Sequence, residues 1–89
     1  MAETAYNIAR GDVVEKVFKI DFMWDDEADV WIATSKDVFG LILEHESFDV
    51  LVGRVRLAIP ELLAFENPVD GDIFLDFAVS RRDRLVING

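Results

Sequence analysis

The sequence predicts a small α+β domain with the element order β-β-β-α-β. Two runs alternate apolar and polar residues with a period of two, at residues 16–24 and 73–80, and a run between them repeats apolar residues at helical spacing, at residues 47–66. Three sequential strands favour an antiparallel meander, and one amphipathic helix must pack on one face of that sheet. The 89 residues allow one domain, in which we expect residues 1–12 to be a flexible or edge arm, 13–80 the core and 81–89 a tail or short strand.

The first two predicted strands flank an acidic turn. One face of the first strand is apolar and carries Phe18, Ile20, Phe22 and Trp24. Residues 25–29 concentrate aspartate and glutamate, and residues 30–34 are β-branched and aromatic, so the two strands should form a hairpin. A polar break at 35–37 and Gly40 precede the short apolar run 41–44, which predicts the third strand.

A helix should begin at Ser47, because serine caps helix N-termini and Asp49 then falls in the first turn. Its apolar stripe consists of Leu51, Val55, Ile59 and Leu62, widened by Phe48, Val52 and Leu63. Pro60 should kink the helix rather than end it, because the helical pattern continues beyond it. Asn67-Pro68 should end the helix, residues 73–80 form the fourth strand, and residues 85–87 suit one more extended piece.

Charge narrows the classes of partner. With 18 acidic and 9 basic side chains the net charge is −9, so direct binding of nucleic acid or of an anionic membrane is not expected, whereas a basic protein partner is favoured. Residues 1–10 lack the pattern of a signal peptide and no apolar stretch approaches a membrane span, so we expect a cytoplasmic protein. The absence of cysteine excludes disulfides and a thiolate nucleophile.

No residue pattern in the chain specifies an enzyme, a cofactor or a metal. His45 lies between two glutamates, but neighbours on an extended chain point to opposite faces, so we interpret it as a non-catalytic exposed residue. The acidic turn lacks the ligand spacing and glycine of a calcium loop. Two alternatives stay open: a metal-dependent nuclease using the scattered carboxylates, and an anion site at the basic cluster. The residues concerned are Asp21, Glu44, Asp72 and Asp76 for the first, and Arg81, Arg82 and Arg84 for the second.

Aromatic residues are numerous for so short a chain, with two tryptophans and seven phenylalanines. Aromatic side chains either fill a core or anchor an interface. Phe39 and Phe74 fall outside the main apolar faces and are candidates for exposed anchors, although core packing of Phe74 is an equal alternative.

The segment from Trp24 to Ser35, followed by residues 37–41, resembles HicB-like antitoxin domains. The residues that match in order are Trp31, Ala33, Asp37, Gly40, Glu44 and Ser47, and the segment Ile59-Pro60-Glu61-Leu62 is similar to one in small stand-alone relatives of that superfamily. The resemblance covers roughly residues 16–79. It implies a partial RNase H-like fold and a partner role, because HicB proteins bind and block HicA, a small basic RNA-cleaving toxin.

Two departures from the family pattern are visible. Phe39 replaces the proline that usually precedes the glycine, which removes a fixed backbone angle. HicB antitoxins usually append a DNA-binding domain, whereas ten residues follow Val79 here, so we do not expect autorepression by this chain alone.

The sequence therefore predicts a non-enzymatic HicB-like interaction domain that neutralises a HicA-type toxin, or an orphan relative of one. We expect a homo-oligomer, a dimer or tetramer, formed by sheet-edge pairing or exposed aromatics. The expected partner-binding residues are Trp31, Asp37, Phe39, Glu44 and Phe74. The alternatives are an orphan oligomeric domain that binds a small anion, and a metal-dependent nuclease.

Overall fold

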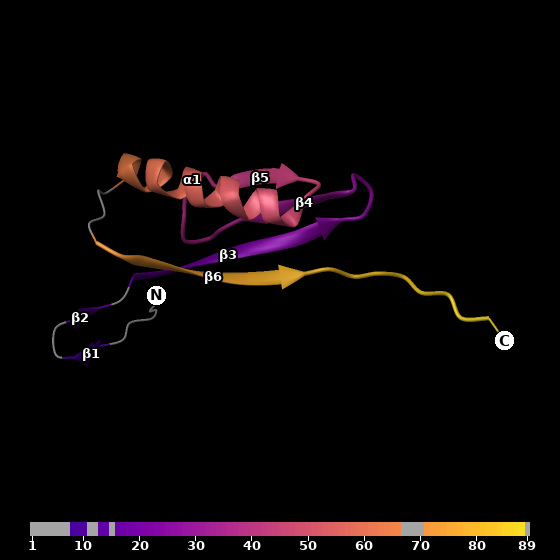
Figure 1. Cartoon of the computed structure of the whole chain (residues 1–89), viewed down its shortest axis with the longest axis horizontal. Helices are drawn as coiled ribbons and strands as arrows, with labels where there is room; N and C mark the ends of the chain where they lie inside the picture. The colour runs from indigo at the N-terminus through magenta and orange to yellow at the C-terminus, as the bar shows by residue number, and fades with distance from the viewer. Residues whose placement is uncertain (1–7, 11–12, 15, 67–70, 89) are drawn as a thin grey trace.

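A computed structural model describes residues 8–10, 13–14, 16–66 and 71–88 (Figure 1). Its elements follow the predicted order after a short N-terminal pair of strands. They are β1 (Ile8–Arg10), β2 (Val13–Val14), β3 (Lys16–Asp25), β4 (Val30–Thr34), β5 (Ile42–His45), α1 (Phe48–Glu66) and β6 (Ile73–Ser80). The β-β-β-α-β prediction is confirmed, since β3, β4, β5, α1 and β6 have the predicted types and lie at the predicted places.

The four-stranded sheet has the strand order β5-β4-β3-β6. Consecutive strands β3, β4 and β5 are antiparallel, which confirms the predicted meander. β6 returns through α1 and pairs in parallel with β3 along its whole length, from Ile73 beside Lys16 to Ser80 beside Met23. β3 is therefore a central strand, and β5 and β6 are the two edges.

The hairpin between β3 and β4 is closed by the acidic turn. The Asp25 carboxylate accepts hydrogen bonds from the backbone N–H groups of Glu27 and Ala28, and the Asp25 carbonyl accepts one from Asp29 at 2.8 Å. Asp29 has a positive φ of 57°, which aspartate tolerates better than most residues. The Asp25 carboxylate therefore stabilises the turn, and the hairpin lies where the sequence predicted it.

α1 begins where Ser47 caps it. The Ser47 Oγ accepts a hydrogen bond from the Val50 N–H at 3.2 Å, and the helix runs through Pro60 to Glu66. The prediction that Pro60 does not end the helix is confirmed. Asn67 and Pro68, the predicted stop, lie outside the described residues.

The core lies between α1 and one face of the sheet, which we call the inner face. Nine apolar residues are buried there: Ile20, Phe22, Ala33, Val38, Leu41, Leu51, Val55, Ile59 and Leu63. The ring of Phe22 lies 5.0 Å from those of Phe48 and Phe77 between centroids. The predicted apolar faces of β3 and α1 are thus the faces that meet.

The β1–β2 pair and residues 81–88 project from this body (Figure 1). β1 lies within residues 1–12, predicted as a flexible or edge segment, and pairs in a separate two-stranded sheet with β2, which falls at the start of the segment predicted as core. Residues 1–7 and 11–12 are outside the described part. After β6, residues 81–88 continue in an extended conformation without strand partners, and we call them the arm. Within the described ranges, no helix has the length and apolar character that a membrane crossing requires.

Candidate functional site

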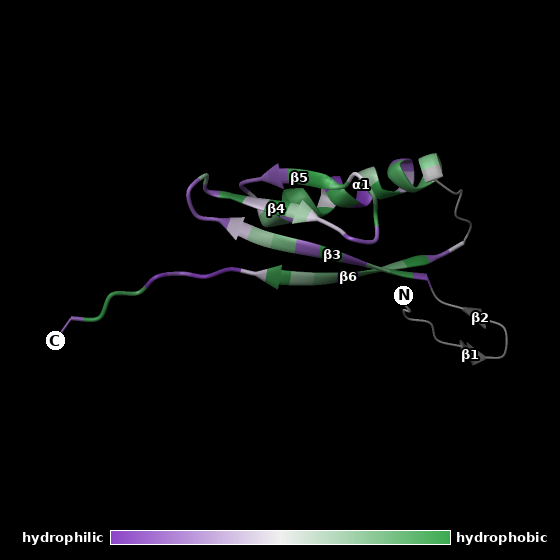
Figure 2. Cartoon of the chain, turned by 180° about the vertical axis from the view of Figure 1, so that it is seen from behind, coloured by the Kyte–Doolittle hydropathy of each residue, from purple (hydrophilic) through white to green (hydrophobic). Residues whose placement is uncertain are grey.

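The side of the sheet opposite α1, which we call the outer face, is not covered by any of the described elements. Strand pairing and the alternation of side chains assign its residues. They are Val17, Lys19, Asp21, Met23, Asp25, Val30, Ile32, Thr34, Ile42, Glu44, Phe74, Asp76, Ala78 and Ser80. Figures 1 and 2 show α1 on the inner face and no second layer of described residues on the other side.

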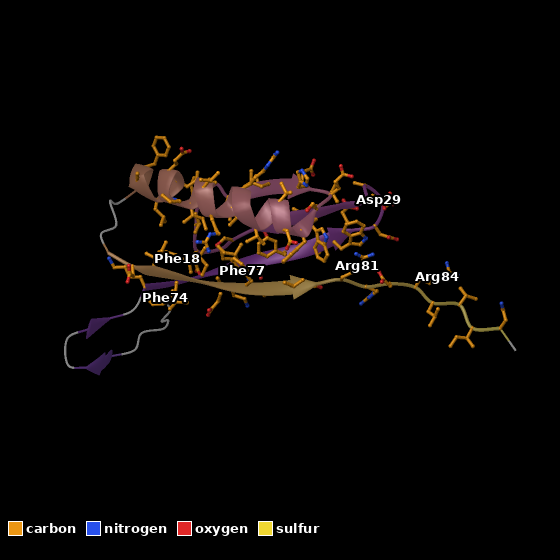
Figure 3. All side chains as sticks on the ribbon, in the orientation of Figure 1. Phe18, Asp29, Phe74, Phe77, Arg81 and Arg84 are labelled. Carbon is orange, nitrogen blue, oxygen red and sulfur yellow. The ribbon has the colours of Figure 1, made fainter. Side chains whose placement is uncertain are left out.

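This outer face mixes exposed apolar groups with carboxylates. Ile42 is 70% exposed, Met23 59% and Phe74 46%. Figure 3 shows Phe18 and Phe77 directed to the α1 side of the sheet and Phe74 on the other side. Sequence reasoning left Phe74 undecided between core and surface; the structure excludes it from the buried core. Met23 and Ile42 were not among the predicted site residues, although strand alternation directs their side chains to the face opposite that of their buried neighbours.

Glu44 is exposed on the outer face, in the edge strand β5 beside Ile32. Asp21 and Asp76 share that face, but Asp21 lies between Thr34 and Ala78, and Asp76 lies beside Lys19. The described ranges contain no group of three or more acidic or histidine side chains arranged to hold a metal ion.

Asp37 fastens the loop after β4 to β3. Its Oδ2 accepts a hydrogen bond from the Lys19 backbone N–H at 2.7 Å, and the Ser35 Oγ donates one to the Lys19 carbonyl at 2.7 Å. The same Ser35 Oγ accepts from the N–H groups of Asp37 and Val38 at 3.0 Å. β4 reaches only as far as Asp21 on β3, so this loop satisfies backbone groups that would otherwise lack a partner.

Phe39 is 80% exposed at the tip of that loop, as expected for an anchor residue. Gly40 beside it has a φ of +87°, and a Cβ at this position would lie 3.5 Å from the Leu62 Cδ2. The positive φ explains why glycine stands here. Phe39 is thus presented on a fixed loop next to the edge strand β5.

Trp31 lies on the inner face rather than on the open one. It is half-buried, and its ring contacts those of Trp24 and Phe48 at centroid distances of 5.3 and 5.1 Å. The Arg81 guanidinium lies 4.3 Å from the centroid of the Trp24 ring and 5.8 Å from that of Trp31. Trp31 therefore packs the end of the core and holds the start of the arm.

His45 and the basic cluster also have structural contacts. The His45 Nδ1 accepts a hydrogen bond from the Ser47 N–H at 2.8 Å, and the side chain is half-buried rather than fully exposed as expected. The Arg81 Nε donates to the Asp83 Oδ1 at 3.0 Å. Of the three arginines of the predicted anion site, Arg81 thus contacts Asp83 and the Trp24 ring of its own chain.

The end of the sheet at the hairpin turn carries several exposed carboxylates, and Arg81 at the base of the arm lies over Trp24 at the same end. β5 pairs with β4 so that His45 lies beside Trp31, which brings the start of α1 close to the hairpin turn. We call the resulting group the acidic end; its exposed members are Asp26, Glu27, Asp29, Glu46 and Asp49. It adjoins the outer face at Glu44.

Comparison with known proteins identifies the family and the fold. Among curated proteins none matches the chain. The solved structure of hypothetical protein TTHA1013 from the extremely thermophilic bacterium Thermus thermophilus is similar, with 33% sequence identity and a TM-score of 0.59 over 81% of this chain and 100% of that one. A domain of unknown function, DUF1902, matches residues 17–88, which span all of the four-stranded sheet except Lys16, together with α1 and the arm. The chain therefore belongs to the DUF1902 family.

Proposed function

We propose that this domain is a non-enzymatic protein-interaction module that binds and neutralises a small basic RNase toxin of the HicA type in the cytoplasm. The observation that carries the proposal is the outer face, an uncovered sheet surface on which exposed apolar side chains alternate with carboxylates. The toxin class comes from the resemblance to HicB-like antitoxins.

The outer face has the composition of a protein interface. Met23, Ile32, Ile42 and Phe74 supply apolar area, and exposed apolar patches rimmed by polar groups mark interaction sites. Phe39 on its loop extends this surface at the β5 edge. Of the five residues expected to bind a partner, Phe39, Glu44, Phe74 and Asp37 are exposed, Asp37 while it also holds the loop to β3, and Trp31 is half-buried against Phe48.

Charge favours a basic partner at the same place. The chain carries a net charge of −9, and Glu44 and the acidic end lie beside the apolar residues. Complementary charge accelerates encounter and selects against acidic partners, while buried apolar groups hold the complex. Fast association through charge and slow dissociation through apolar contacts are the properties that a protein needs to neutralise a cationic toxin.

A cleavage assay with a purified HicA-type toxin tests the proposal. Addition of this chain at equal concentration should stop RNA cleavage, and the affinity should fall as salt rises because exposed charges are screened. The double substitution Met23→Ser/Ile42→Ser should weaken inhibition by roughly a hundredfold, from the loss of two apolar contacts.

Two matched controls separate the outer face from general effects. Leu57→Ser/Phe65→Ser removes two exposed apolar residues from α1 and should leave inhibition unchanged. Glu44→Lys/Glu46→Lys should weaken it by about tenfold or more, whereas Glu61→Lys/Asp72→Lys, with the same change in charge, should have a smaller effect. Cleavage that continues in the presence of this chain, or equal effects of target and control variants, would contradict the proposal.

A further inference from the structure

The edge strand β6 is exposed at two places, along its free backbone edge and on its inner face. In the described part of the chain it pairs with β3 alone, so its other edge presents free N–H and C=O groups. Its inner-face residues are also open, with Phe77 39% and Val79 54% exposed, although their partners Ile20 and Phe22 on β3 are fully buried. An exposed edge with an apolar inner side is a surface that another strand can complete.

The arm is an extended segment that pairs with no strand among the described residues. It continues the direction of β6 away from the body and ends in Leu85, Val86 and Ile87, which are 82%, 63% and 83% exposed (Figures 1 and 3). Arg81 fixes its base through the Trp24 ring and Asp83. The family match extends to residue 88, so the arm is part of the domain.

A groove of about 380 Å³ lies between α1 and the beginning of β6. Arg56, Ile59 and Pro60 line it from α1, and Ile73, Phe74, Leu75 and Phe77 line it from β6. The arm of the same chain points away from this groove, because it continues β6 beyond the opposite end of the strand. A second copy that pairs with β6 about a two-fold axis runs antiparallel to it, so its arm points toward the groove.

We propose that two copies of this chain form a dimer in which β6 of each copy pairs with the arm of the other, so that the arms are exchanged. The two-fold axis passes at Ser80, which lies opposite Ser80 of the second copy. Each arm then runs along the other copy's β6, and its apolar end reaches the groove. The two sheets join into one continuous sheet with both helices on the same side.

Length and alternation together select this register. β6 has eight residues, 73–80, and the arm has as many, 81–88, so an axis at Ser80 places residues 81–87 of the arm opposite residues 79–73 of β6. Antiparallel partners share a face, so odd residues meet odd residues. Leu85 then lies opposite Leu75 and Ile87 opposite Ile73, both on the inner face where the groove opens.

Charge supports the same register. On the outer face, Arg84 of one copy lies opposite Asp76 of the other, and Val86 lies opposite the half-exposed Phe74. An opposite-charge pair directly across two strands stabilises the pairing. The arm carries three of the nine basic residues of a chain with 18 acidic ones, so a second copy offers it the complementary charge.

Disulfide cross-linking tests the register directly, because the chain contains no cysteine. Antiparallel partners have Cα atoms about 4.5–5.5 Å apart, which lies within the range of disulfides. Ser80→Cys should form a covalent dimer under mild oxidation, and Thr34→Cys, an equally exposed single thiol on β4, should not. Cross-linking of Ser80→Cys no faster than of Thr34→Cys would overturn the proposed register.

Oligomeric state by light scattering over a dilution series tests the dimer without any toxin, so its outcome is independent of the proposed function. The wild-type chain should be dimeric and dissociate on dilution. Leu85→Ser/Ile87→Ser should weaken the dimer by roughly a hundredfold or more, since both arms lose their apolar contacts, while Leu57→Ser/Phe65→Ser should not. A wild-type chain that stays monomeric would overturn the proposal.

Charge exchange adds a test that a folding defect cannot imitate. Asp76→Arg and Arg84→Asp should each weaken the dimer by about tenfold, because each creates two like-charge pairs across the two-fold axis. The variant carrying both substitutions should recover wild-type affinity. Absence of that recovery would overturn the pairing of Asp76 with Arg84.

Discussion

β3 and β6 lie side by side and carry the same kind of sequence, but the middle of the inner face is fully covered on β3 and half-open on β6. Ile20 and Phe22 are at most 1% exposed, whereas their neighbours Phe77 and Val79 are 39% and 54% exposed. α1 packs closest to β4 and β5, and therefore leaves the β6 side of the sheet partly open. Period-two alternation thus identifies the face of a strand that is apolar, but not the element that covers it.

The largest effect should come from removing the ring at the centre of the covered part. Phe22→Ala should lower the free energy of unfolding by about 3–5 kcal/mol, because the cavity would lie between Phe48 and Phe77. Urea denaturation followed by tryptophan fluorescence measures this loss. Phe65→Ala, at an 86% exposed position on α1, is the control and should change stability little.

A smaller and concentration-dependent effect is expected at the open part. Phe77→Ala should lower the free energy of unfolding by about 1–2 kcal/mol in dilute protein, because the ring is only partly buried. The loss should grow at high concentration, where the proposed second copy covers the ring. The same urea titration at two protein concentrations measures it, and a loss as large as that of Phe22→Ala in dilute protein would contradict the comparison.

The part of β3 that β4 does not reach should depend on the loop that replaces it. Asp37→Ala should lower the free energy of unfolding by about 1 kcal/mol, because it removes the acceptor of the Lys19 N–H. In the Asp37→Ala variant, hydrogen exchange should become faster at the Lys19 amide, and the rate at the Phe22 amide should change less. Lys36→Ala in the same loop should leave that exchange rate unchanged.

The smallest effect concerns the base of the arm. Arg81→Ala should lower the free energy of unfolding by about 0.5 kcal/mol, the magnitude of an exposed cation–π contact. The emission of Trp24 and Trp31 should shift at the same time, because the guanidinium covers them. Arg82→Ala should leave the spectrum unchanged, and an identical shift in both variants would mean that the arm is not held by Arg81.

Local patterns sufficed to predict every element of the four-stranded sheet and its helix. Alternation located β3 and β6, the acidic residues located the hairpin, and Ser47 marked the start of α1, because each of these features depends on neighbours in the sequence. The parallel pairing of β6 with β3 could not be predicted in the same way. It depends on which strand the chain reaches after the helix, and no local pattern encodes that choice.

The candidate site was predicted less completely for a related reason. Phe39 was recognised as an exposed candidate because it lies outside every apolar stripe. Trp31 was expected to contact a partner, yet its ring packs on Phe48 from another element, a contact that spacing does not reveal. Asp37 matched a family motif, but its bond to the Lys19 backbone appears only when the loop is placed against β3.

The parallel pairing of β3 and β6 has a consequence for the order of folding. Lys16 pairs with Ile73, and the hairpin, β5 and α1 separate the two residues in the sequence. Contacts between residues so far apart in the sequence slow folding. Until β6 arrives, one whole edge of β3, the longest strand, stands open to other chains. A nascent or truncated chain that ends before Ile73 should therefore aggregate, whereas one extended through Ser80 has its central strand protected on both sides.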